Sequence, residues 1–386
     1  MYGAQKCLLD LLEGLDRNLI EPYLVCPDTG ALTERCAAIG IPVFIRSMHH
    51  WVLPGSRRNY SYFNLINSVL RGLRGRVWAI ASLVERINID AIYTNTVTVL
   101  EGALVARITH KPHIWHLHEV VRGNMELKPL LPQFILNWAV AAFSDIRIIN
   151  SQFAQRIYRI SRLDSRSMLV YNGIDTRVFN PSNRRHLGVA AQLSLPTDSK
   201  HVIVIGAIHP RKGIDVLLAA ARLLRNAHPE IHFLIVGDGE EKYVEQIKMQ
   251  VITAQLDSHF HFLGWQEAPT LIASADVLVS AARQETFGLT VAEAMASGTP
   301  VVATRSGGPQ EIIEHMYNGM LVPIDDPESL ALAIVDVLAD PGLARRLSQN
   351  GVRRVNEAFT LEKYVSSIQE GILQSVKAHA ATHIQT

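Results

Sequence analysis

One stretch of the chain, residues 276–304, constrains the fold most, because two apolar runs flank a polar loop and a short helical pattern. The first run ends at Ser280, and the second begins at Val301, after Gly298 and Pro300. Two short apolar runs joined by a helix indicate parallel strands that are buried on both faces. The stretch therefore predicts an α/β protein built on a parallel sheet.

The loop of this stretch carries two glutamates that bracket the start of the helix. Glu285 precedes the helix, and Glu293 lies in its first turns. Between them the backbone of Phe287, Gly288 and Leu289 opens the helix, and free N–H groups at a helix start can bind an anion. Carboxylates beside an anion site suit a ligand that carries both negative charge and hydroxyl groups, such as a sugar nucleotide.

Each glutamate also has a purely structural interpretation. Thr290-x-x-Glu293 matches a capping box, in which the glutamate only closes the helix start. Glu285 would then be a solvated loop carboxylate. The combination of both glutamates with Gly288 and with Lys212, which follows an earlier strand, favours a ligand site.

The alternation of strands and helices occurs twice along the 386 residues, which are too many for one ordinary core. A polar boundary, with Asn172–Asp175 and Ser182–His186, separates the two series. We expect a first domain over 1–175, a second over 176–358, and a final helix within 359–386 that returns to brace the first domain. The predicted strands are 23–27, 42–46, 91–95, 113–118, 147–150 and 168–171 in the first series, and 201–207, 232–236, 259–263, 276–280, 301–304 and 320–323 in the second.

The chain opens on a helical pattern, with Leu8, Leu9, Leu11, Leu12 and Leu15 at helical spacing. A doubly wound sheet normally starts with a central strand. We therefore expect that the first strand is missing and that the sequence starts downstream of the natural N-terminus. A variant sheet with a helical start is the alternative.

Composition narrows the class of protein. Lys and Arg total 37 against 36 Asp and Glu, so the formal charge of +1 predicts no nucleic-acid partner. Three cysteines, Cys7, Cys26 and Cys36, have no metal or redox spacing and favour a reducing compartment. No run of eighteen apolar residues and no signal peptide is found, which predicts a cytoplasmic protein.

A second group of candidate ligands follows the first strand of the second series. Gly206 to Gly213 opens a helix with Arg211 and Lys212, and adjacent cations there oppose the helix dipole unless an anion binds. A solvated basic turn is the alternative. Gly264, after a later strand, marks a tight loop at the same sheet edge and is a weak signal.

Three histidines alternate along the predicted strand 113–118 of the first domain. Period two places His116 and His118 on one face and His113 on the other. His118 stands at the carboxyl end of the strand, where parallel sheets bind ligands, whereas His116 is expected in the core. No further metal ligands accompany them, so we predict no metal site.

A basic and aromatic stretch in the first domain can rest on an anionic membrane surface, and a solvated charged face is the alternative. Its residues are Trp51, Arg57, Arg58, Tyr60, Tyr62, Phe63, Arg71, Arg74, Arg76 and Trp78.

Together these residues resemble the family-four retaining glycosyltransferases of the GT-B fold over nearly the whole chain. The matching segments are Tyr171-Asn-Gly-Ile-Asp175, Pro210-Arg-Lys-Gly213, Val236-Gly-Asp-Gly239, Phe262-Leu-Gly264 and the stretch from Glu285 to Ala303. The glutamate stretch is the most specific of them.

The resemblance implies two facing Rossmann-like domains with the active site in the cleft, the first binding the acceptor and the second the donor. It implies transfer of a sugar, with retention, from a UDP- or GDP-sugar to a glycan, lipid-linked or small-molecule acceptor. The nucleotide sugar is then the co-substrate, with no other cofactor and no obligatory metal. A nucleotide-sugar epimerase or phosphorylase on the same fold, or a nucleotide-sugar-binding protein without turnover, are the alternatives.

The resemblance also implies residue roles. Glu293 would bind the ribose hydroxyls, and Glu285 would hold hydroxyls of the transferred sugar. Phe287, Gly288 and Leu289 would bind the diphosphate through the backbone, with Arg211 and Gly264 in the same donor set. Lys212 would neutralise charge on the leaving diphosphate, and His118 would orient a sugar hydroxyl.

Two positions depart from the family pattern. Relatives often have an arginine where this chain has Ala207, and Arg211 is expected to take part of that role. Gly3-Ala4-Gln5 resembles the end of the glycine-rich loop that follows the family's first strand. This agrees with a missing first strand.

Overall fold

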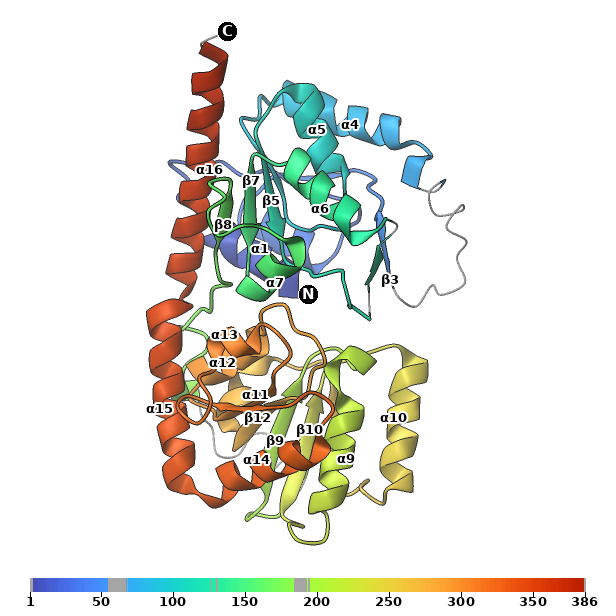
Figure 1. Ribbon diagram of the computed structural model, residues 1–386, viewed down its shortest axis with the longest axis vertical. Coiled ribbons are helices and arrows are strands. Elements are labelled where there is room, and N and C mark those ends of the chain that lie inside the picture. Colours follow the sequence, from blue (N-terminus) through green and yellow to red (C-terminus); the bar gives the residue numbers. More distant parts are fainter. Residues whose placement is uncertain are drawn as a thin grey trace. The chain divides into compact units, whose positions relative to one another are not determined.

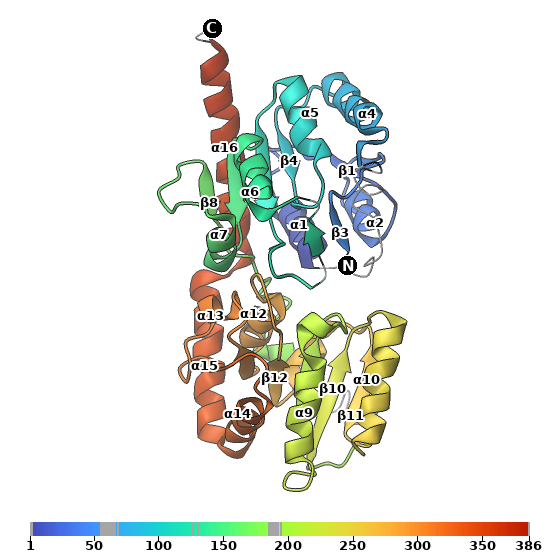
Figure 2. The same cartoon turned by 45° about the vertical axis from the view of Figure 1, so that its right-hand side comes forward.

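A computed structural model describes residues 3–54, 67, 69–125, 127–129, 131–183, 193 and 195–384. The chain divides into two compact units (Figures 1 and 2). Unit 1 comprises Met1–Gly173 and Leu361–Thr386, and unit 2 comprises Ile174–Thr360. These divisions lie within two residues of the boundaries drawn at 175 and 358 from the sequence.

Unit 2 is built on one six-stranded sheet with the order β11-β10-β9-β12-β13-β14, in which every pairing is parallel. The first strand of the unit, β9, lies in the middle, which confirms the doubly wound arrangement. The strands are β9 (Lys200–Ile205), β10 (Ile231–Val236), β11 (Phe260–Gly264), β12 (Val277–Ser280), β13 (Val301–Thr304) and β14 (Met320–Val322).

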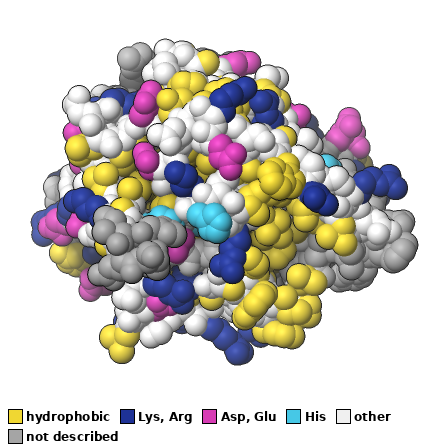
Figure 3. Space-filling view, turned by 90° about the horizontal axis from the view of Figure 1, so that it is seen from above, with side chains coloured by type: hydrophobic (Ala, Val, Ile, Leu, Met, Phe, Trp, Pro, Cys, Tyr) yellow, Lys and Arg dark blue, Asp and Glu magenta, His cyan; other side chains and the backbone are white. Residues whose placement is uncertain are grey.

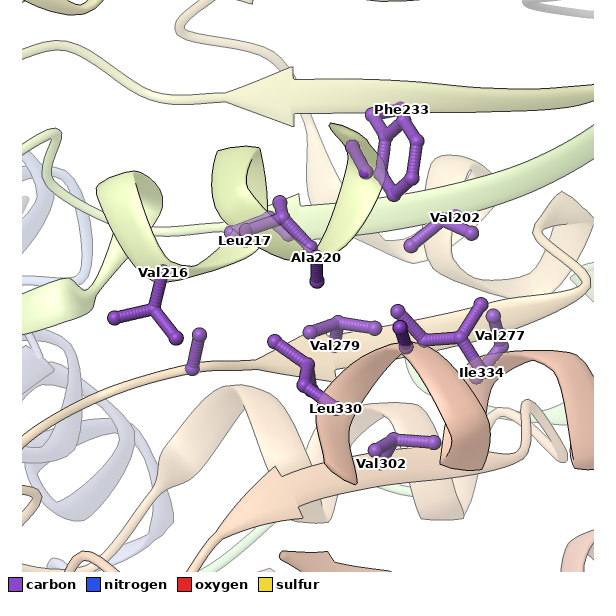
Figure 4. Close-up of a cluster of buried hydrophobic side chains, with 14 of the residues drawn as sticks. Val202, Val216, Leu217, Ala220, Phe233, Val277, Val279, Val302, Leu330 and Ile334 are labelled. Carbon is purple, nitrogen blue, oxygen red and sulfur yellow. The ribbon is translucent and has the colours of Figure 1, made fainter. Parts of the chain in front are cut away.

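Helices cover both faces of this sheet. Figure 4 shows Leu217 and Ala220 of α9 and Leu330 and Ile334 of α14 pointing at the valines of β9, β12 and β13. On the other face α11 contacts β9, and α12 contacts β12 and β13. The helices are α9 (Ile214–Leu224), α10 (Glu241–Thr253), α11 (Ala268–Ser274), α12 (Leu289–Ala296), α13 (Pro309–Ile312), α14 (Pro327–Ala339) and α15 (Pro341–Ala358), with 3-10 turns η1 (Pro181–Asn183) and η2 (Pro210–Lys212).

The ends of the longest helices of unit 2 follow from local sequence. Asp326 and Asp340 are the N-caps of α14 and α15, and each carboxylate accepts backbone N–H bonds of the first turn. A proline at the first helical position follows each cap, where its missing N–H costs nothing.

Unit 1 has its parallel sheet in two pieces. A four-stranded sheet has the order β4-β5-β7-β8, and β1 and β2 form a separate parallel pair. The strands are β1 (Leu24–Cys26), β2 (Val43–Ile45), β4 (Ile92–Thr94), β5 (His113–Leu117), β7 (Ile146–Ile149) and β8 (Ser167–Leu169). Among the described residues, β1 pairs with β2 alone and β4 with β5 alone.

The helices of unit 1 include the last one of the chain. They are α1 (Gly3–Gly14), α2 (Ala31–Ala38), α4 (Leu73–Arg86), α5 (Glu101–Thr109), α6 (Gln133–Ala142), α7 (Gln152–Tyr158) and α16 (Leu361–Ile384). α16 contacts α1, β5 and β7, and Tyr364 donates a hydrogen bond to the carbonyl of Cys7. The predicted helix at the start of the chain is confirmed by α1.

The sequence did not predict the antiparallel pair of β3 (Val52–Pro54) and β6 (Leu127–Pro129). Both strands have three residues and contain Pro54 or Pro129, so neither shows the length or the pattern of a strand.

Candidate functional site

The loop after β12 is held by backbone pairing with the loop after β13. The N–H of Glu285 donates to the carbonyl of Ser306 at 2.9 Å, and the N–H of Gly308 donates to the carbonyl of Glu285 at 2.8 Å. A Cβ at Gly308 would lie 2.3 Å from Cα of Phe287, so only glycine permits this approach. The backbone of Glu285 is therefore held by two hydrogen bonds to the loop that follows β13.

The helix α12 begins at Leu289, with Gly288 as its N-cap at φ +103°. Within the described residues, the N–H groups of Gly288, Leu289 and Thr290 have no hydrogen-bond partner. Phe287 is 2% exposed and packs edge-on against Phe359, with ring centroids 5.6 Å apart. Its side chain anchors the turn, which leaves the backbone available for a ligand.

The capping-box interpretation of Glu293 is wrong. Thr290 is the second residue of α12, so it is not the N-cap that such a box requires. Glu293 is in the fifth position of the helix and is only 5% exposed.

Both cations of the turn after β9 bind the Glu285 carboxylate. Nη1 of Arg211 donates to Oε1 of Glu285 at 3.0 Å and to the carbonyl of Gln284 at 2.8 Å. Nζ of Lys212 donates to the same Oε1. The three side chains are between 13% and 20% exposed, so their interaction is partly shielded from water.

Backbone geometry brings this turn to the end of β12. The N–H of Arg283 donates to the carbonyl of Arg211 at 2.8 Å. Gly213 has φ +68°, and a Cβ there would lie 2.0 Å from the carbonyl oxygen of Ala281. Lys212 lies against Gly206, whose missing side chain leaves room for its stem.

The cations decide the charge state of Glu285. Burial alone would raise the pKa of its carboxyl, but Lys212 and then Arg211 outweigh that effect and hold the pKa at about 2. Glu285 is therefore ionised at neutral pH and is an acceptor of hydrogen bonds only.

The sequence did not identify Arg283, which ties the basic turn to the sheet. Its guanidinium pairs with Asp215 at 2.7 Å and with Asp325 at 2.7 Å, and it also donates to the carbonyl of Pro210. Its position within the glutamate stretch, two residues before Glu285, was the only signal.

Gly264 ends β11 with φ +64°, and its carbonyl accepts the N–H of Gly237 at 2.8 Å. A Cβ there would come within 3.8 Å of the Asp238 carboxylate, so close packing does not exclude a side chain. The glycine thus serves the turn, and no hydrogen bond or ion pair joins it to Glu285 among the described residues.

In unit 1, His118 follows β5 and Asn95 follows the neighbouring strand β4. The side-chain amide of Asn95 donates to the carbonyl of Ala4 at 2.9 Å, which turns its oxygen toward His118 at 3.0 Å from Nε2. Since an amide oxygen only accepts, Nε2 carries the proton and Nδ1 is left as an acceptor. Asn95 was not identified from the sequence.

The other two histidines lie as predicted. His116 stacks on His118 with ring centroids 3.8 Å apart, is fully buried and meets the hydroxyl of Tyr93. His113 lies on the opposite face against Trp115. Burial lowers the pKa of His118 to about 3 and that of His113 to about 4, so both rings are neutral at pH 7.

Glu119, next to His118, is a second residue that the sequence did not indicate. Its carboxylate accepts the hydroxyl of Thr96 at 3.0 Å and the N–H of Val97 at 3.3 Å. Burial raises its pKa to about 7, and these hydrogen bonds lower the pKa by less than burial raises it.

The basic and aromatic stretch of unit 1 is only partly on the surface. Trp51 is 5% exposed and donates to the carbonyl of Val97, and Arg76 forms a buried ion pair with Glu101 at 2.8 Å. These two residues cannot contact a membrane, which corrects the prediction for them. Arg71, Arg74 and Trp78 are exposed. Arg57, Arg58, Tyr60, Tyr62 and Phe63 lie outside the described residues, as does part of the polar boundary 182–186.

Within the described ranges, no group of His, Cys, Asp and Glu is arranged to hold a metal ion. In the same ranges, no helix has the length and apolar character needed to cross a bilayer.

Two family models cover most of the chain. The model described as Glycosyltransferase Family 4 matches residues 1–178, and the model described as Glycosyl transferases group 1 matches residues 189–354. The lipopolysaccharide core biosynthesis glycosyltransferase LpsE of Rhizobium meliloti is 34% identical over 173 residues, which are 45% of this chain and 49% of LpsE. The match thus spans about half of that relative.

Longer but more distant matches extend over nearly the whole chain. The Escherichia coli UDP-Gal:alpha-D-GlcNAc-diphosphoundecaprenol alpha-1,3-galactosyltransferase is 24% identical over 384 residues, 96% of this chain and 93% of that protein. The crystal structure of Anabaena HepE with UDP and glucose has a TM-score of 0.78 at 23% identity and covers 96% of each chain. Because the two models together match most of both units, the chain belongs to the group 1, family 4 glycosyltransferases and has their GT-B fold.

Proposed function

We propose that this chain transfers a sugar from a nucleoside diphosphate sugar to an acceptor hydroxyl with retention of the anomeric configuration. The observation that carries the proposal is the arrangement of charges in unit 2. Arg211 and Lys212 meet one oxygen of Glu285, and the same loop leads three residues later into the open N–H groups of α12.

The two cations and the helix start suit a diphosphate. Lys212 supplies a point charge and Arg211 a planar donor, and the N–H groups of Gly288 to Thr290 add fixed dipoles. These groups would stabilise the charge that develops on the leaving diphosphate, so they would act most strongly in the transition state. We therefore expect no obligatory metal.

The two glutamates suit the hydroxyl groups of the donor. Glu285, held ionised by its cations, can only accept hydrogen bonds, and sugar hydroxyls are donors. Glu293, buried in α12, is assigned to the ribose on the family resemblance, as Gly264 is assigned to the donor set. Neither is given the role of deprotonating the acceptor.

His118 of unit 1 is assigned to orienting a sugar hydroxyl. Its Nδ1 is an acceptor because Asn95 fixes the proton on Nε2. With a pKa of about 3 it stays neutral at physiological pH, so it would act as a hydrogen-bond acceptor without gaining a charge.

The relatives favour a UDP-sugar donor and a glycan or lipid-linked acceptor. HepE was crystallised with UDP-glucose, and the Escherichia coli relative acts on a diphosphoundecaprenol-linked sugar. We infer the same classes for this chain, with a role in polysaccharide or lipopolysaccharide synthesis. The free thiols Cys7, Cys26 and Cys36 agree with a cytoplasmic location.

The test is release of nucleoside diphosphate from a panel of UDP-, GDP- and ADP-sugars with glycan and lipid-linked acceptors. We expect Glu285→Gln and Lys212→Ala each to reduce turnover by about two to three orders of magnitude. Arg177→Gln is the matched control, because it also removes a cation from an ion pair, and that pair is with Asp175 and not with Glu285. The anomeric configuration of the product, read by proton NMR, tests retention.

The other functions predict different results. Binding of a nucleotide sugar without release under any acceptor would indicate a binding protein. Conversion of the donor sugar without an acceptor would indicate an epimerase, and dependence on inorganic phosphate a phosphorylase. Unchanged turnover in both Glu285→Gln and Lys212→Ala would contradict the site assignment.

A further inference from the structure

Helix α6 of unit 1 exposes aromatic side chains to solvent. Its ten residues include no charged side chain. Leu136, Ala139 and Val140 are buried, whereas Phe134 is 70% and Trp138 64% exposed. These two residues are four apart and therefore lie on the same face of the helix. Large exposed aromatic groups on one face indicate an interaction surface.

A cavity of about 260 Å³ lies beside this face. Phe134, Trp138, Val140, Tyr158 and Ile160 supply its apolar lining. Its polar lining is centred on an ion pair, in which Arg147 meets Asp164 at 2.6 Å and is 2% exposed. Because Arg147 and Asp164 neutralise each other, the apolar lining and the exposed Arg159 remain to receive a partner.

A second cavity, of about 200 Å³, has more cationic than acidic side chains in its lining. Arg107, Lys111 and Arg166 line it with His110 and His379, against the single carboxylate of Asp145. Asp145 already accepts the backbone N–H of His113 at 2.8 Å. Within the part of the chain that the structure describes, the side chains of Arg107 and Lys111 have no hydrogen-bond or ion-pair partner.

The two cavities are neighbours. Trp138 lines the first and Phe143 the second, and their rings are in edge-on contact with centroids 6.1 Å apart. The apolar lining of the first cavity thus adjoins the cationic lining of the second, with the contact between Trp138 and Phe143 joining the two cavities. Figure 3 shows a face of the molecule on which hydrophobic side chains gather beside Lys and Arg.

The segment after α7, residues 159–166, also exposes an apolar side chain next to arginines. Leu163 is 94% exposed, and Arg159 and Arg162 beside it are exposed as well. Arg159 lines the first cavity, and Arg166 lines the second. Against these arginines the segment 159–166 has one acidic residue, Asp164, which is engaged by Arg147.

We propose that this surface, comprising α6, the segment 159–166 and the two cavities, binds an anionic membrane surface. Phe134, Trp138 and Leu163 would enter the boundary between head groups and acyl chains, where aromatic side chains are favoured. Arg107, Lys111, Arg159 and Arg162 would meet the phosphates of anionic lipids, and the cationic cavity would take one phosphate group. The charge complementarity favours a lipid over an apolar protein surface, and the proposal does not depend on the reaction proposed above.

The experiment measures binding of the full chain to sedimented vesicles. Phosphatidylglycerol mixed with phosphatidylcholine is compared with phosphatidylcholine alone. We expect binding to the anionic vesicles only, and a decrease in partitioning of about tenfold or more for Phe134→Ser combined with Trp138→Ser. Arg107→Glu combined with Lys111→Glu should lose the preference for anionic lipid. Far-UV circular dichroism and thermal midpoints verify that the variants are folded.

The control tests a different exposed basic surface of unit 1, on α4. Trp78, on α4, is 54% exposed and comparable to Trp138. Trp78→Ser combined with Arg74→Glu should leave vesicle binding unchanged. A loss in this control that equals the loss in the α6 variant would overturn the proposal, and so would equal binding to both vesicle types or none to either.

Two further measurements separate other occupants. Inorganic phosphate at about the concentration of the lipid phosphate should not release the protein, because it lacks the apolar contact. Release by phosphate alone would indicate an anion site without a membrane and would overturn the proposal. Self-association in sedimentation velocity that Trp138→Ser abolishes, without vesicle binding, would indicate an interface with a second copy and would overturn it as well.

Discussion

Two glutamates that each follow a parallel strand, one in each unit, have opposite shifts in pKa. Glu119 follows β5 in unit 1 and Glu285 follows β12 in unit 2 after a short loop, so both are near the carboxyl end of a parallel strand. Burial raises the pKa of Glu119 to about 7, whereas Lys212 and Arg211 hold that of Glu285 at about 2. The neighbours, and not the residue type or strand position, set the charge of each carboxyl.

The sheets of the two units differ in a related way. Unit 2 has one continuous sheet, and loops from β9, β12 and β13 converge on Glu285 through backbone hydrogen bonds. In unit 1 the described strands form separate sheets, and His118 is positioned by side-chain bonds through Asn95. At several glycines of unit 2 the backbone of another segment lies so close that no side chain fits. We therefore expect substitutions that add even one methyl group to disturb the site of unit 2 more than that of unit 1.

The largest effect is expected from adding one methyl group in unit 2. Gly213→Ala places a Cβ 2.0 Å from the carbonyl of Ala281 at φ +68°, so the turn must move. We expect a loss of more than about 3 kcal/mol in the free energy of unfolding. Gly40→Ala in unit 1 has a similar φ of +77° but nothing within 4 Å, so about 1 kcal/mol is expected.

The measurement is urea unfolding together with hydrogen exchange of peptides from β9 and β10. If the two alanine variants lose the same stability, close packing does not distinguish the units at these glycines.

An intermediate effect is expected at Arg283. Arg283→Gln removes the ion pairs with Asp215 and Asp325 that hold the basic turn. Since both carboxylates are substantially exposed, we expect a loss of about 1 kcal/mol in stability together with weaker donor binding. Isothermal titration with the donor that the panel identifies measures the second effect.

Arg35→Gln in unit 1 is the matched control, because its pair with Glu13 is longer, at 3.5 Å, and more exposed. It should change neither stability nor donor binding. Donor binding that is unaffected by Arg283→Gln would show that the ion pairs do not position the turn.

The smallest effect concerns pH. A carboxyl whose folded pKa is about 7 binds more protons in the folded than in the unfolded state between its ordinary pKa and pH 7. Its contribution to stability therefore falls as pH rises through that range. Glu119→Gln removes this loss, so the variant should gain stability relative to the parent chain between pH 5 and pH 8.

Glu285→Gln should behave differently in the same urea titrations. With a folded pKa of about 2, Glu285 contributes stability that is complete above its ordinary pKa and is lost only as pH falls toward 2. Its replacement should cost the same at pH 5 and at pH 8. An equal pH dependence in the two variants would contradict the opposite charge states.

Much of the fold could be predicted because its signals are local. The apolar runs at β9 to β14 and the helices between them follow from residue pattern, and the order with β9 in the middle follows from the rules of parallel sheets. The pair β3–β6 could not be predicted, because two three-residue strands join segments more than seventy residues apart.

The candidate site divides in the same way. Glu285, Lys212, Gly288 and His118 were identified because they follow strands at one sheet edge or match a specific motif. Asn95, Glu119, Arg283 and Asp215 were not, because single polar residues after a strand or at a helix start have many ordinary explanations.

The sequence by itself determined the family, the two series of strands and the residues that gather at the carboxyl edge of the second sheet. Only the tertiary structure decided which charges meet. It showed that Lys212 and Arg211 share one oxygen of Glu285, that Gly288 rather than Thr290 precedes α12, and that Trp51 and Arg76 are buried. The reason is physical: residue pattern fixes which face of an element is apolar, whereas charge states and contacts depend on distances of a few ångströms between residues far apart in the chain.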